Sequence, residues 1–280
     1  LGGLDVSAAT IAVGNATTTG AVTLDGSTTL GGSIATNGGA FSVTGPTMLA
    51  ADTTVNSGSG AIAFGGTVNG STDGGHSLSP PSSGPATFSA AVGATQRLRT
   101  LTTDAGGSTT LRSVSTSGDQ HYGDAVTFAA NANLAGADIR FDDTVGGGIA
   151  LQLAPTGSAT LSGNATLQSL TVNGATTLGA DVTTTLGQTY NGTLTLSGPA
   201  TALTASTLTV AGALVASVAG ASALTVATTG AAVFQSAIGA TRALGGFATA
   251  AGGSVSLPEL HASGAVSLGN DATLNGDLFT

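Results

Sequence analysis

The stretch VGGGIALQLAPTGSATL at residues 145–161 returns as VAGASALTVATTGAAVF at residues 218–234. The two copies align without a gap, so that Leu151 corresponds to Leu224, and glycines and apolar residues fall at matching positions. Because self-similarity at a fixed spacing is typical of stacked repeat proteins, this match decides the interpretation of the whole chain.

Further matches extend the repeat along the sequence. The two copies are offset by 73 residues. At the same offset before the first copy, Leu78 and Phe88 occupy the positions of Leu151 and Leu161. FSAAVGAT at 88–95 matches a second sequence, FQSAIGAT at 234–241, at twice that offset, although the later copy lacks six residues around 120–122. We interpret this pattern as a degenerate superrepeat of roughly 73 residues that runs nearly from end to end.

Short alternating runs within each copy predict β-strands. AVTF at 125–128, TLTL at 193–196 and TLTV at 207–210 alternate apolar and polar residues, which places successive side chains on opposite faces. Glycine and asparagine punctuate such runs, for example at Asn173 and Gly174, and no segment shows helical periodicity. Strands this short are stable only when successive coils stack, so we predict an all-β parallel β-solenoid.

The predicted architecture is a single solenoid over residues 1–280, interpreted as a segment of a longer chain because it begins at Leu1 and stops within a repeat at Thr280. If each superrepeat makes three coils of about 24 residues, the chain forms about a dozen coils and a rod roughly 55–60 Å long. The proline-rich stretch around 69–85 stays in register with the repeat, so we expect one enlarged coil with a protruding loop there.

The composition excludes several functional classes. The chain has 45 glycines, 7% charged residues, 4% aromatic residues, no cysteine and a net charge of −9. A nucleic-acid surface needs clustered basic residues, whereas this chain has no lysine. We expect no disulfide, no thiolate metal site and no membrane span, since no apolar run reaches the roughly 18 residues required. The only basic residues besides histidine are Arg97, Arg99, Arg112, Arg140 and Arg242.

Acidic residues offer the only candidates for chemistry. The densest cluster is DQHYGD at 119–124, and Asp138 and the Asp142–Asp143 pair follow. The counterpart GQTYNG at 187–192 keeps the glutamine and the tyrosine but loses both aspartates and the histidine. We therefore interpret the cluster as a loop at a coil corner, and Asp142 and Asp143 as turn residues. We predict no catalytic, cofactor-binding or metal-binding residue, and no cofactor.

Three other features fit no clear site. His76, His121 and His261 are too widely spaced for a metal-ligand pattern. Threonine clusters at 17–19 and 183–185 do not recur at one coil spacing, which argues against an ice-binding array. Glycosylation sequons begin at Asn15, Asn69, Asn164 and Asn191 and leave glycosylation open.

Residues 98–141 contain a pattern that resembles a known family. The matching positions are Leu98, Leu101, 106–111, Thr116, Gly118, Gln120, Tyr122, 125–128, Leu134, Gly136, Ile139 and Phe141. The pattern is similar to the repeats of filamentous-haemagglutinin-like exoproteins and related β-strand-repeat surface proteins of Gram-negative bacteria. The resemblance implies a right-handed parallel β-helix, export across the outer membrane, and roles in adhesion, biofilm matrix or surface filaments. The sequence lacks the Asn-Pro-Asn-Gly motif of the secretion domain.

We therefore expect a secreted, non-enzymatic rod at the bacterial cell surface, part of an adhesin or of a surface filament. The expected partners are glycans of a host, a neighbouring cell or the matrix, and further copies of the chain in head-to-tail assembly. The alternative is a carbohydrate-binding or carbohydrate-cleaving β-helix protein, which a groove lined by acids and aromatics would favour.

Overall fold

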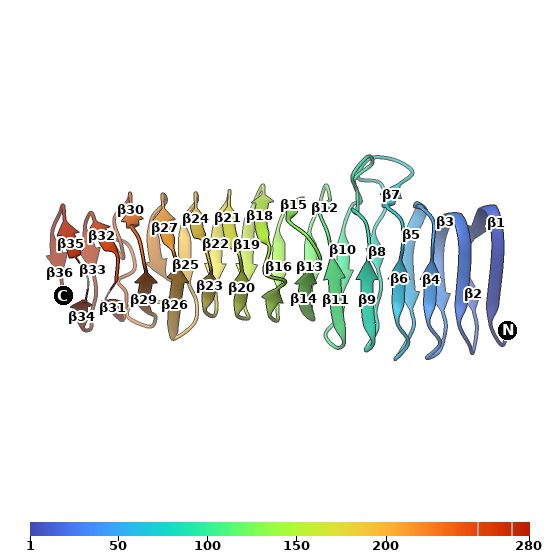
Figure 1. Cartoon of the computed structure of the whole chain (residues 1–280), viewed down its shortest axis with the longest axis horizontal. Coiled ribbons are helices and arrows are strands. Elements are labelled where there is room, and N and C mark those ends of the chain that lie inside the picture. The colour runs from blue at the N-terminus through green and yellow to red at the C-terminus, as the bar shows by residue number, and fades with distance from the viewer. Residues whose placement is uncertain (251, 270) are drawn as a thin grey trace. The chain divides into compact units, whose positions relative to one another are not determined.

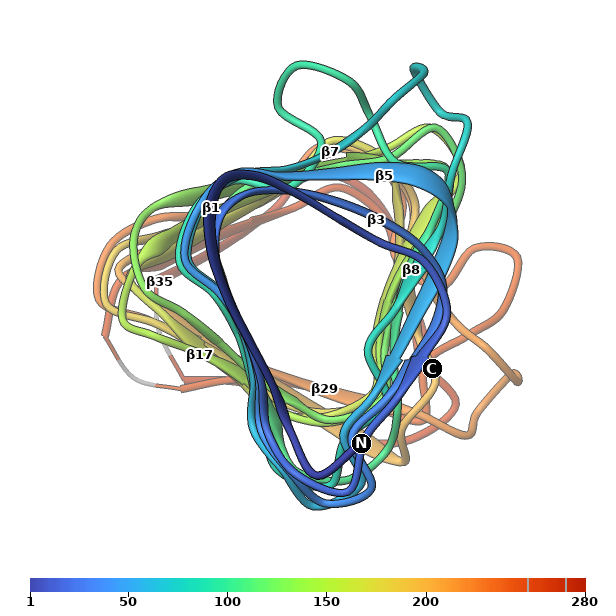
Figure 2. The ribbon, with the colours of Figure 1, turned by 90° about the vertical axis from the view of Figure 1, so that its right-hand side faces the viewer.

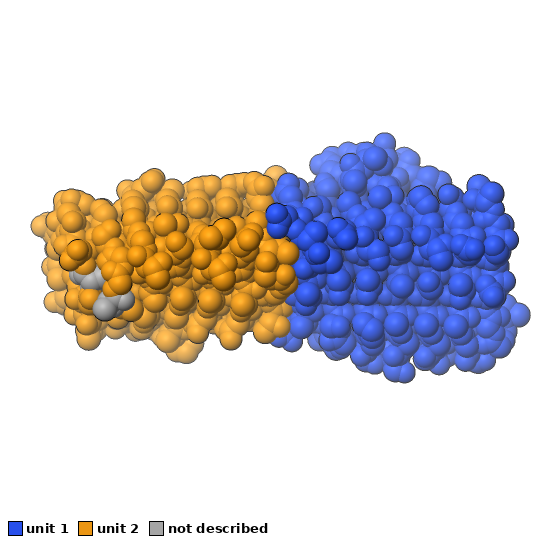
Figure 3. Space-filling view, viewed as in Figure 1, with its two compact units in different colours: residues 1–143 blue, residues 144–280 orange. Residues whose placement is uncertain are grey.

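The computed structural model describes residues 1–250, 252–269 and 271–280, and these residues form strands but no helix (Figure 1). In particular, the described part of the chain offers no apolar helix that could cross a membrane. The chain divides into two compact units, Leu1–Asp143 and Thr144–Thr280 (Figure 3). The all-β prediction is confirmed.

Unit 1 contains the first sixteen strands. They are β1 (Leu4–Val13), β2 (Ala16–Thr17), β3 (Val22–Ala35), β4 (Phe41–Val43), β5 (Thr47–Asn56), β6 (Ile62–Phe64), β7 (Val68–Gly70), β8 (Leu78–Ser79), β9 (Pro85–Phe88), β10 (Leu101–Thr103), β11 (Ser108–Leu111), β12 (Val114–Ser115), β13 (Gln120–Tyr122), β14 (Ala125–Phe128), β15 (Ala132–Gly136) and β16 (Ile139–Phe141).

Unit 2 contains the remaining strands. They are β17 (Val145–Gly146), β18 (Ala150–Pro155), β19 (Ser158–Leu161), β20 (Ala165–Leu167), β21 (Ser169–Val172), β22 (Ala175–Leu178), β23 (Val182–Thr184), β24 (Gly187–Tyr190), β25 (Leu194–Leu196), β26 (Ala200–Ala205), β27 (Thr207–Val210), β28 (Leu214–Ala216), β29 (Ala223–Thr228), β30 (Ala232–Phe234), β31 (Gly246–Thr249), β32 (Ser254–Leu257), β33 (Leu260–His261), β34 (Val266–Leu268), β35 (Asp271–Leu274) and β36 (Leu278–Phe279).

Each unit is a parallel β-solenoid with three faces, as the outline in Figure 2 shows for the first coils. In unit 2 one face is the column β18–β21–β24–β27, a second is β19–β22–β25–β28, and a third is β20–β23–β26–β29. Unit 1 has the same arrangement, for example in the column β10–β13–β16. All of these pairings are parallel. Each short strand inside a column is therefore hydrogen-bonded to one strand in the coil before it and to one in the coil after it.

The core is built by period-2 alternation along every strand. In β14, for example, Val126 and Phe128 are buried while Thr127 is exposed. Parallel pairing in register then stacks the inward residues of successive coils on one another. Phe64 of β6 stacks on Phe88 of β9 with ring centroids 5.1 Å apart, and it contacts Phe41 of β4 at 5.7 Å. The apolar interior is therefore a set of continuous rows along each unit.

The coil is shorter than the sequence suggested. Leu101 pairs with Gln120 and Gln120 pairs with Ile139, so one turn takes 19 residues in this column. The described chain makes about 14 turns at a spacing of about 19 residues. The longer coil expected from the superrepeat is wrong for most of the chain, although the turn from Ile62 to Ala86 does reach the expected length.

The reason is that residues matched by the superrepeat lie on different faces. Leu151 belongs to the face of β18 and β21, whereas Leu224 belongs to the face of β26 and β29. Three turns lead from Leu151 to Leu208, and the chain then crosses the face of β28 before it reaches Leu224. From Leu151 in β18 to Leu224 in β29 the chain moves from one face to the next eleven times, whereas three complete coils would need nine such moves.

The proline-rich stretch lies inside the regular coil. Pro80 is buried behind β8, and the carbonyl of Pro81 accepts a hydrogen bond from Ser57 N at 3.3 Å. The part of this coil that protrudes is residues 71–77, which leave the stack between β7 and β8 (Figure 1). The insertion is thus accommodated without breaking the ladder.

Truncating a stacked core ring should destabilise unit 1. In Phe64→Ala the cavity between the rings of Phe41 and Phe88 should lower the free energy of unfolding by about 3–5 kcal/mol. Urea titration followed by circular dichroism measures the change. The control is Leu186→Ala, because Leu186 is 52% exposed. Equal effects of the two substitutions would contradict a continuous interior row.

Candidate functional site

Two adjacent loops leave the coil in unit 1 and form the protrusion visible on that unit (Figures 2 and 3). The first covers residues 71–77, and the second covers residues 93–97. Gly74 N of the first loop donates a hydrogen bond to Arg97 O of the second loop at 2.8 Å. The loops are therefore tied to each other by the backbone as well as by side chains.

An ion pair closes the tip of this protrusion. Arg97 binds Asp73 through two guanidinium nitrogens, with Nε–Oδ1 at 3.0 Å and Nη2–Oδ2 at 2.6 Å. The backbone N–H of Arg97 also donates to Asp73 Oδ1 at 2.9 Å. These bonds to Arg97 hold the pKa of Asp73 at about 2, so the pair stays ionised over the ordinary pH range.

A second ion pair fixes the base of the first loop. Arg99 Nη2 lies 2.6 Å from Asp52 Oδ2, and Ser77 N donates to Asp52 Oδ1 at 2.9 Å. The hydrogen bond from Ser77 lowers the pKa of Asp52; slight burial opposes this shift, and Arg99 lowers the pKa further. The tip of the loop is thus held through Asp73, and its base is held by the carboxylate of Asp52.

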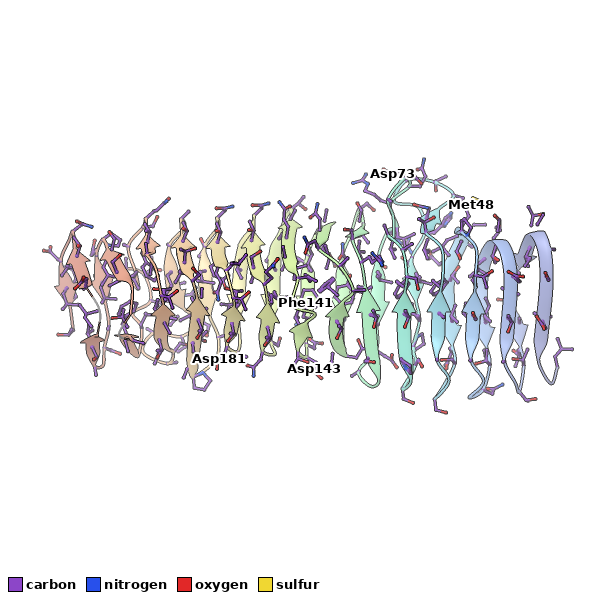
Figure 4. All side chains as sticks on the ribbon, in the orientation of Figure 1. Met48, Asp73, Phe141, Asp143 and Asp181 are labelled. Atoms are coloured by element: carbon purple, nitrogen blue, oxygen red, sulfur yellow. The ribbon has the colours of Figure 1, made fainter. Side chains whose placement is uncertain are left out.

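A groove with a volume of about 430 Å³ lies at the foot of the protrusion. Figure 4 shows Met48 beside the loop on which Asp73 lies. The residues that line the groove are Thr10, Ser27, Thr28, Thr29, Pro46, Thr47, Met48, Asn69, Gly70, Ser71, Thr95 and Gln96. None of these residues is charged.

The same pair of loops recurs in unit 2, at residues 217–222 and 239–243, with the same offset that relates FSAAVGAT to FQSAIGAT. Gly220 N donates to Ala243 O at 2.8 Å, and this bond is the counterpart of the one between the two loops of unit 1. Figure 2 shows the loops of unit 2, in orange, leaving the coil outline. The loop pair is therefore a repeated element of the fold.

The side chains at the tips of the two loop pairs differ although the backbone hydrogen bond between the loops is the same. Ala219 and Ala243 stand at the positions of Asp73 and Arg97, so unit 2 has no ion pair there. Val218 is 64% exposed at the tip. The fold holds the backbone constant while the tip changes from charged to apolar.

The acidic stretch 119–124 is not the corner loop that we expected. Its centre forms β13, and Gln120 and Tyr122 point into the core, because they alternate with His121 along the strand. Tyr122 Oη donates to Gln120 Oε1 at 3.0 Å, and Gln120 Nε2 donates to Ala135 O at 2.8 Å. The glutamine and tyrosine form an internal polar pair.

The counterpart in unit 2 has the same geometry. Tyr190 Oη donates to Gln188 Oε1 at 3.1 Å, and Gln188 Nε2 donates to Thr204 O at 2.9 Å. Burial raises the pKa of both tyrosines above the usual phenol range. The Gln-x-Tyr motif therefore returns in both copies because it packs the core.

The ionisable side chains on the outer surface of β13 and β16 pair with one another. His121 Nε2 lies 2.7 Å from Asp142 Oδ2, and Arg140 Nε contacts Asp142 Oδ1. Partial burial would raise the pKa of Asp142, but the hydrogen bonds from His121 and Arg140 outweigh it and lower the pKa. Asp119 Oδ1 accepts a hydrogen bond from Asp138 N at 3.2 Å. Asp143 lies beside Asp142 in the bend after β16, as predicted for turn residues.

Asp124 is the one carboxyl group of this cluster that is buried, with 3% of its surface exposed. Thr103 Oγ1 and Thr109 Oγ1 donate to its Oδ1 at 3.0 and 2.8 Å. Burial raises the pKa of Asp124, although the two threonine hydrogen bonds oppose the shift. Two hydroxyl donors thus satisfy a carboxyl group inside a coil corner.

Several other carboxylates and amides connect adjacent coils. Asp104 Oδ1 accepts from Ser82 N at 2.9 Å, and Asp181 Oδ1 accepts from Ala202 N at 2.7 Å. All four sequon asparagines also make hydrogen bonds between coils, three as acceptors from a backbone N–H and Asn191 as a donor. Their contacts are Asn15 with Ser33 N, Asn69 with Thr95 N, Asn164 with Asp181 N, and Asn191 with Asn173 Oδ1.

The threonine clusters bury their middle residue. Thr18 Oγ1 donates to Gly20 O at 2.7 Å, and Thr184 Oγ1 donates to Leu186 O at 3.1 Å. These clusters therefore turn a coil corner and do not form an exposed array. Threonines do align in register elsewhere, as Thr171 with Thr189 on neighbouring strands.

The remaining histidines make separate contacts, each within its own unit. His76 Nε2 lies 2.9 Å from Ser71 Oγ in the first loop, while His261 contacts Glu259 and stacks on Phe279 in unit 2. Among the described residues, no group of three or more histidine, cysteine, aspartate or glutamate side chains could hold a metal ion.

The geometry defines a parallel β-solenoid with repeated surface loops. Comparison with known proteins adds no relative: no protein-family profile, no curated protein and no solved structure matches this chain.

The sequence alone does not indicate the groove. Met48 and Gln96 belong to no motif, and Asn69 stands out only as the first residue of a sequon. The match between FSAAVGAT and FQSAIGAT is a signal from which the second loop and its recurrence could have been inferred, because both sequences lead into it. The floor of the groove has no such signal, since its residues come from separate coils.

Two glycines in corresponding loops should be irreplaceable. Gly93 and Gly239 have φ angles of 71° and 73°, and a Cβ would lie 2.0 Å from Ser115 O or 2.3 Å from His261 O. Gly93→Ala and Gly239→Ala should each lower the free energy of unfolding by at least about 1 kcal/mol in urea titrations. Gly2→Ala is the control, because nothing lies within 4 Å of its Cβ. If either substitution left the free energy of unfolding unchanged, the two loops would not share the positive-φ backbone described here.

Neutralising Asp124 should stabilise unit 1 in a pH-dependent way. A carboxyl whose pKa is raised by folding contributes stability at low pH, and it loses this contribution as the pH rises above the unfolded value of 3.8. Asp124→Asn keeps an acceptor for both threonines but has no charge. Its free energy of unfolding relative to the parent chain should therefore increase from pH 3 to about pH 7.

Urea titrations across that pH range measure this difference. Asp5→Asn, at an exposed position, is the control and should change stability by no more than about 0.5 kcal/mol at any pH. If Asp124→Asn were the less stable chain at pH 7, the charged carboxylate would be favourable in its site and the argument would be wrong.

Proposed function

We propose that this chain is a non-enzymatic structural and adhesive protein of the bacterial cell surface, part of an adhesin or of a surface filament. The observation that supports this proposal best is the repeated loop pair. Two units present the same backbone with different side chains at the tip, such as Asp73 in one and Ala219 in the other. Such an arrangement suits a scaffold that presents variable contact points.

The interior of the chain supports a structural role. The coils are held by continuous backbone ladders and by carboxylate or amide bridges between coils, such as Asp181 to Ala202 N. Most carboxyl groups discussed above are engaged in these bridges or in ion pairs, which assigns them a part in stability. The extracellular location rests on the resemblance of residues 98–141 to exported repeat proteins.

A carbohydrate-binding protein is the second candidate, and the groove of unit 1 favours it. The groove is lined by hydroxyl and amide groups and contains no carboxylate. Because glycoside hydrolysis usually requires two carboxyl groups flanking the bond, this lining supports binding without cleavage.

Surface display tests the proposal. Displaying the 280-residue chain on a non-adherent bacterium should raise attachment to other cells or to matrix glycans several-fold over cells with the empty display system. Antibody labelling confirms equal display, and electron micrographs of purified chain distinguish a polymerising filament subunit from an adhesin. Unchanged attachment with the chain on the surface, or cleavage of polysaccharides by the purified chain, would contradict the proposal.

A further inference from the structure

We propose that the groove at the foot of the protrusion in unit 1 is a binding site for an uncharged glycan. This inference rests on the proposed adhesive function and names the ligand class of one site. The groove combines a floor of mixed chemistry, a fixed wall and an uncharged lining, and the corresponding position in unit 2 lacks Met48, Asn69 and Gln96.

The floor is a straight row of side chains from adjacent coils. Thr29 of β3 pairs with Met48 of β5, and Met48 pairs with Asn69 of β7. Because parallel strands lie about 4.8 Å apart, these three residues form a line perpendicular to the strands. Met48 is 44% exposed in the middle of this line. The floor therefore combines one apolar contact with polar groups on both sides.

The wall of the groove is fixed before any ligand arrives. Asn69 Oδ1 accepts hydrogen bonds from Thr95 N at 3.1 Å and from Gln96 N at 3.4 Å. Gly70 N donates to Gln96 O at 3.2 Å. The second loop is thus attached to the floor through Asn69 and to the first loop by the Arg97 ion pair. A wall held in this way loses little conformational entropy on binding.

The lining chemistry favours a neutral polyhydroxyl ligand. Hydroxyl groups of Thr29, Ser71 and Thr95 and the amide of Gln96 can each donate and accept hydrogen bonds, as sugar hydroxyls do. A charged ligand would lose hydration against a lining with no counter-charge. The thioether of Met48 offers a polarisable surface for the apolar face of a sugar ring. The volume of about 430 Å³ falls within the range of small-molecule sites.

The corresponding position in unit 2 has different chemistry. Thr195, Val215 and Arg242 stand where unit 1 has Met48, Asn69 and Gln96. The valine cannot accept the hydrogen bonds that fix the second loop of unit 1, and Arg242 Nη1 donates to Ser217 O at 3.0 Å. Unit 2 therefore provides a matched control on the same backbone.

Isothermal titration of the whole chain tests the site directly. The probes are cellohexaose, maltohexaose and mannohexaose, with hexagalacturonic acid as the charged counterpart of the same length. At least one neutral hexasaccharide should bind at one site per chain, and the acidic probe should bind at least about tenfold more weakly.

Variants locate the binding to the groove. Met48→Glu and Gln96→Ala should each weaken the neutral probe by about fivefold or more, since one places a charge in the floor and the other removes a donor and acceptor. Thr195→Glu and Arg242→Ala, the matched substitutions in unit 2, should leave the affinity unchanged. Circular dichroism melting curves of all four variants confirm that they fold.

The inference is overturned if no neutral probe binds, if the acidic probe binds more tightly, or if the unit 2 variants weaken binding as much as the groove variants do. The proposed function fails separately. Attachment of displaying cells that persists without saccharide binding would leave adhesion in place and remove the glycan site. Saccharide binding without attachment would support the site and contradict adhesion.

Discussion

The parallel backbone ladder between coils is the constraint on which the rest of the structure depends. Each strand of three or four residues is too short to be stable alone, so its N–H and C=O groups must be satisfied by the coils above and below. This requirement keeps equivalent residues in register, as Leu170, Gln188 and Leu208 illustrate. Core rows, aromatic stacks and carboxylate bridges between coils all follow from that register, because each of them joins residues one turn apart.

The sequence predicted the fold class because the alternation is local. Val126 and Phe128, separated by Thr127, identify a strand without reference to any other coil. The coil length was not accessible in this way. Residues matched by the sequence repeat lie on different faces of the coil, as Leu151 and Leu224 do. β34 pairs with β31 as β13 pairs with β10, so the later copy keeps this strand although the sequence alignment leaves six residues out there. The repeat in sequence and the turn in space therefore need not coincide.

The candidate site could be predicted only in part. Turn positions for Asp142 and Asp143 follow from local chemistry, and the structure has them in a bend. The inward orientation of Gln120 and Tyr122 depends on which alternate residues of β13 face the core. The acidic residues on both sides of this short strand favour a loop, so the sequence does not indicate that alternation. The groove requires the register of three coils, because Thr29, Met48 and Asn69 become neighbours only through pairing. Local sequence patterns do not reveal which strands of different coils pair, and the groove depends on that pairing.

Cysteine cross-linking measures the coil register most directly, because the chain has no cysteine of its own. Thr171 and Thr189 are paired across adjacent strands, whereas Thr171 and Thr195 lie on different faces. Strands about 4.8 Å apart bring their Cα atoms within disulfide range. The double variant Thr171→Cys with Thr189→Cys should therefore cross-link on mild oxidation, and Thr171→Cys with Thr195→Cys should not. Preferential cross-linking of the second pair, as the longer coil suggested by the superrepeat would require, would contradict the account.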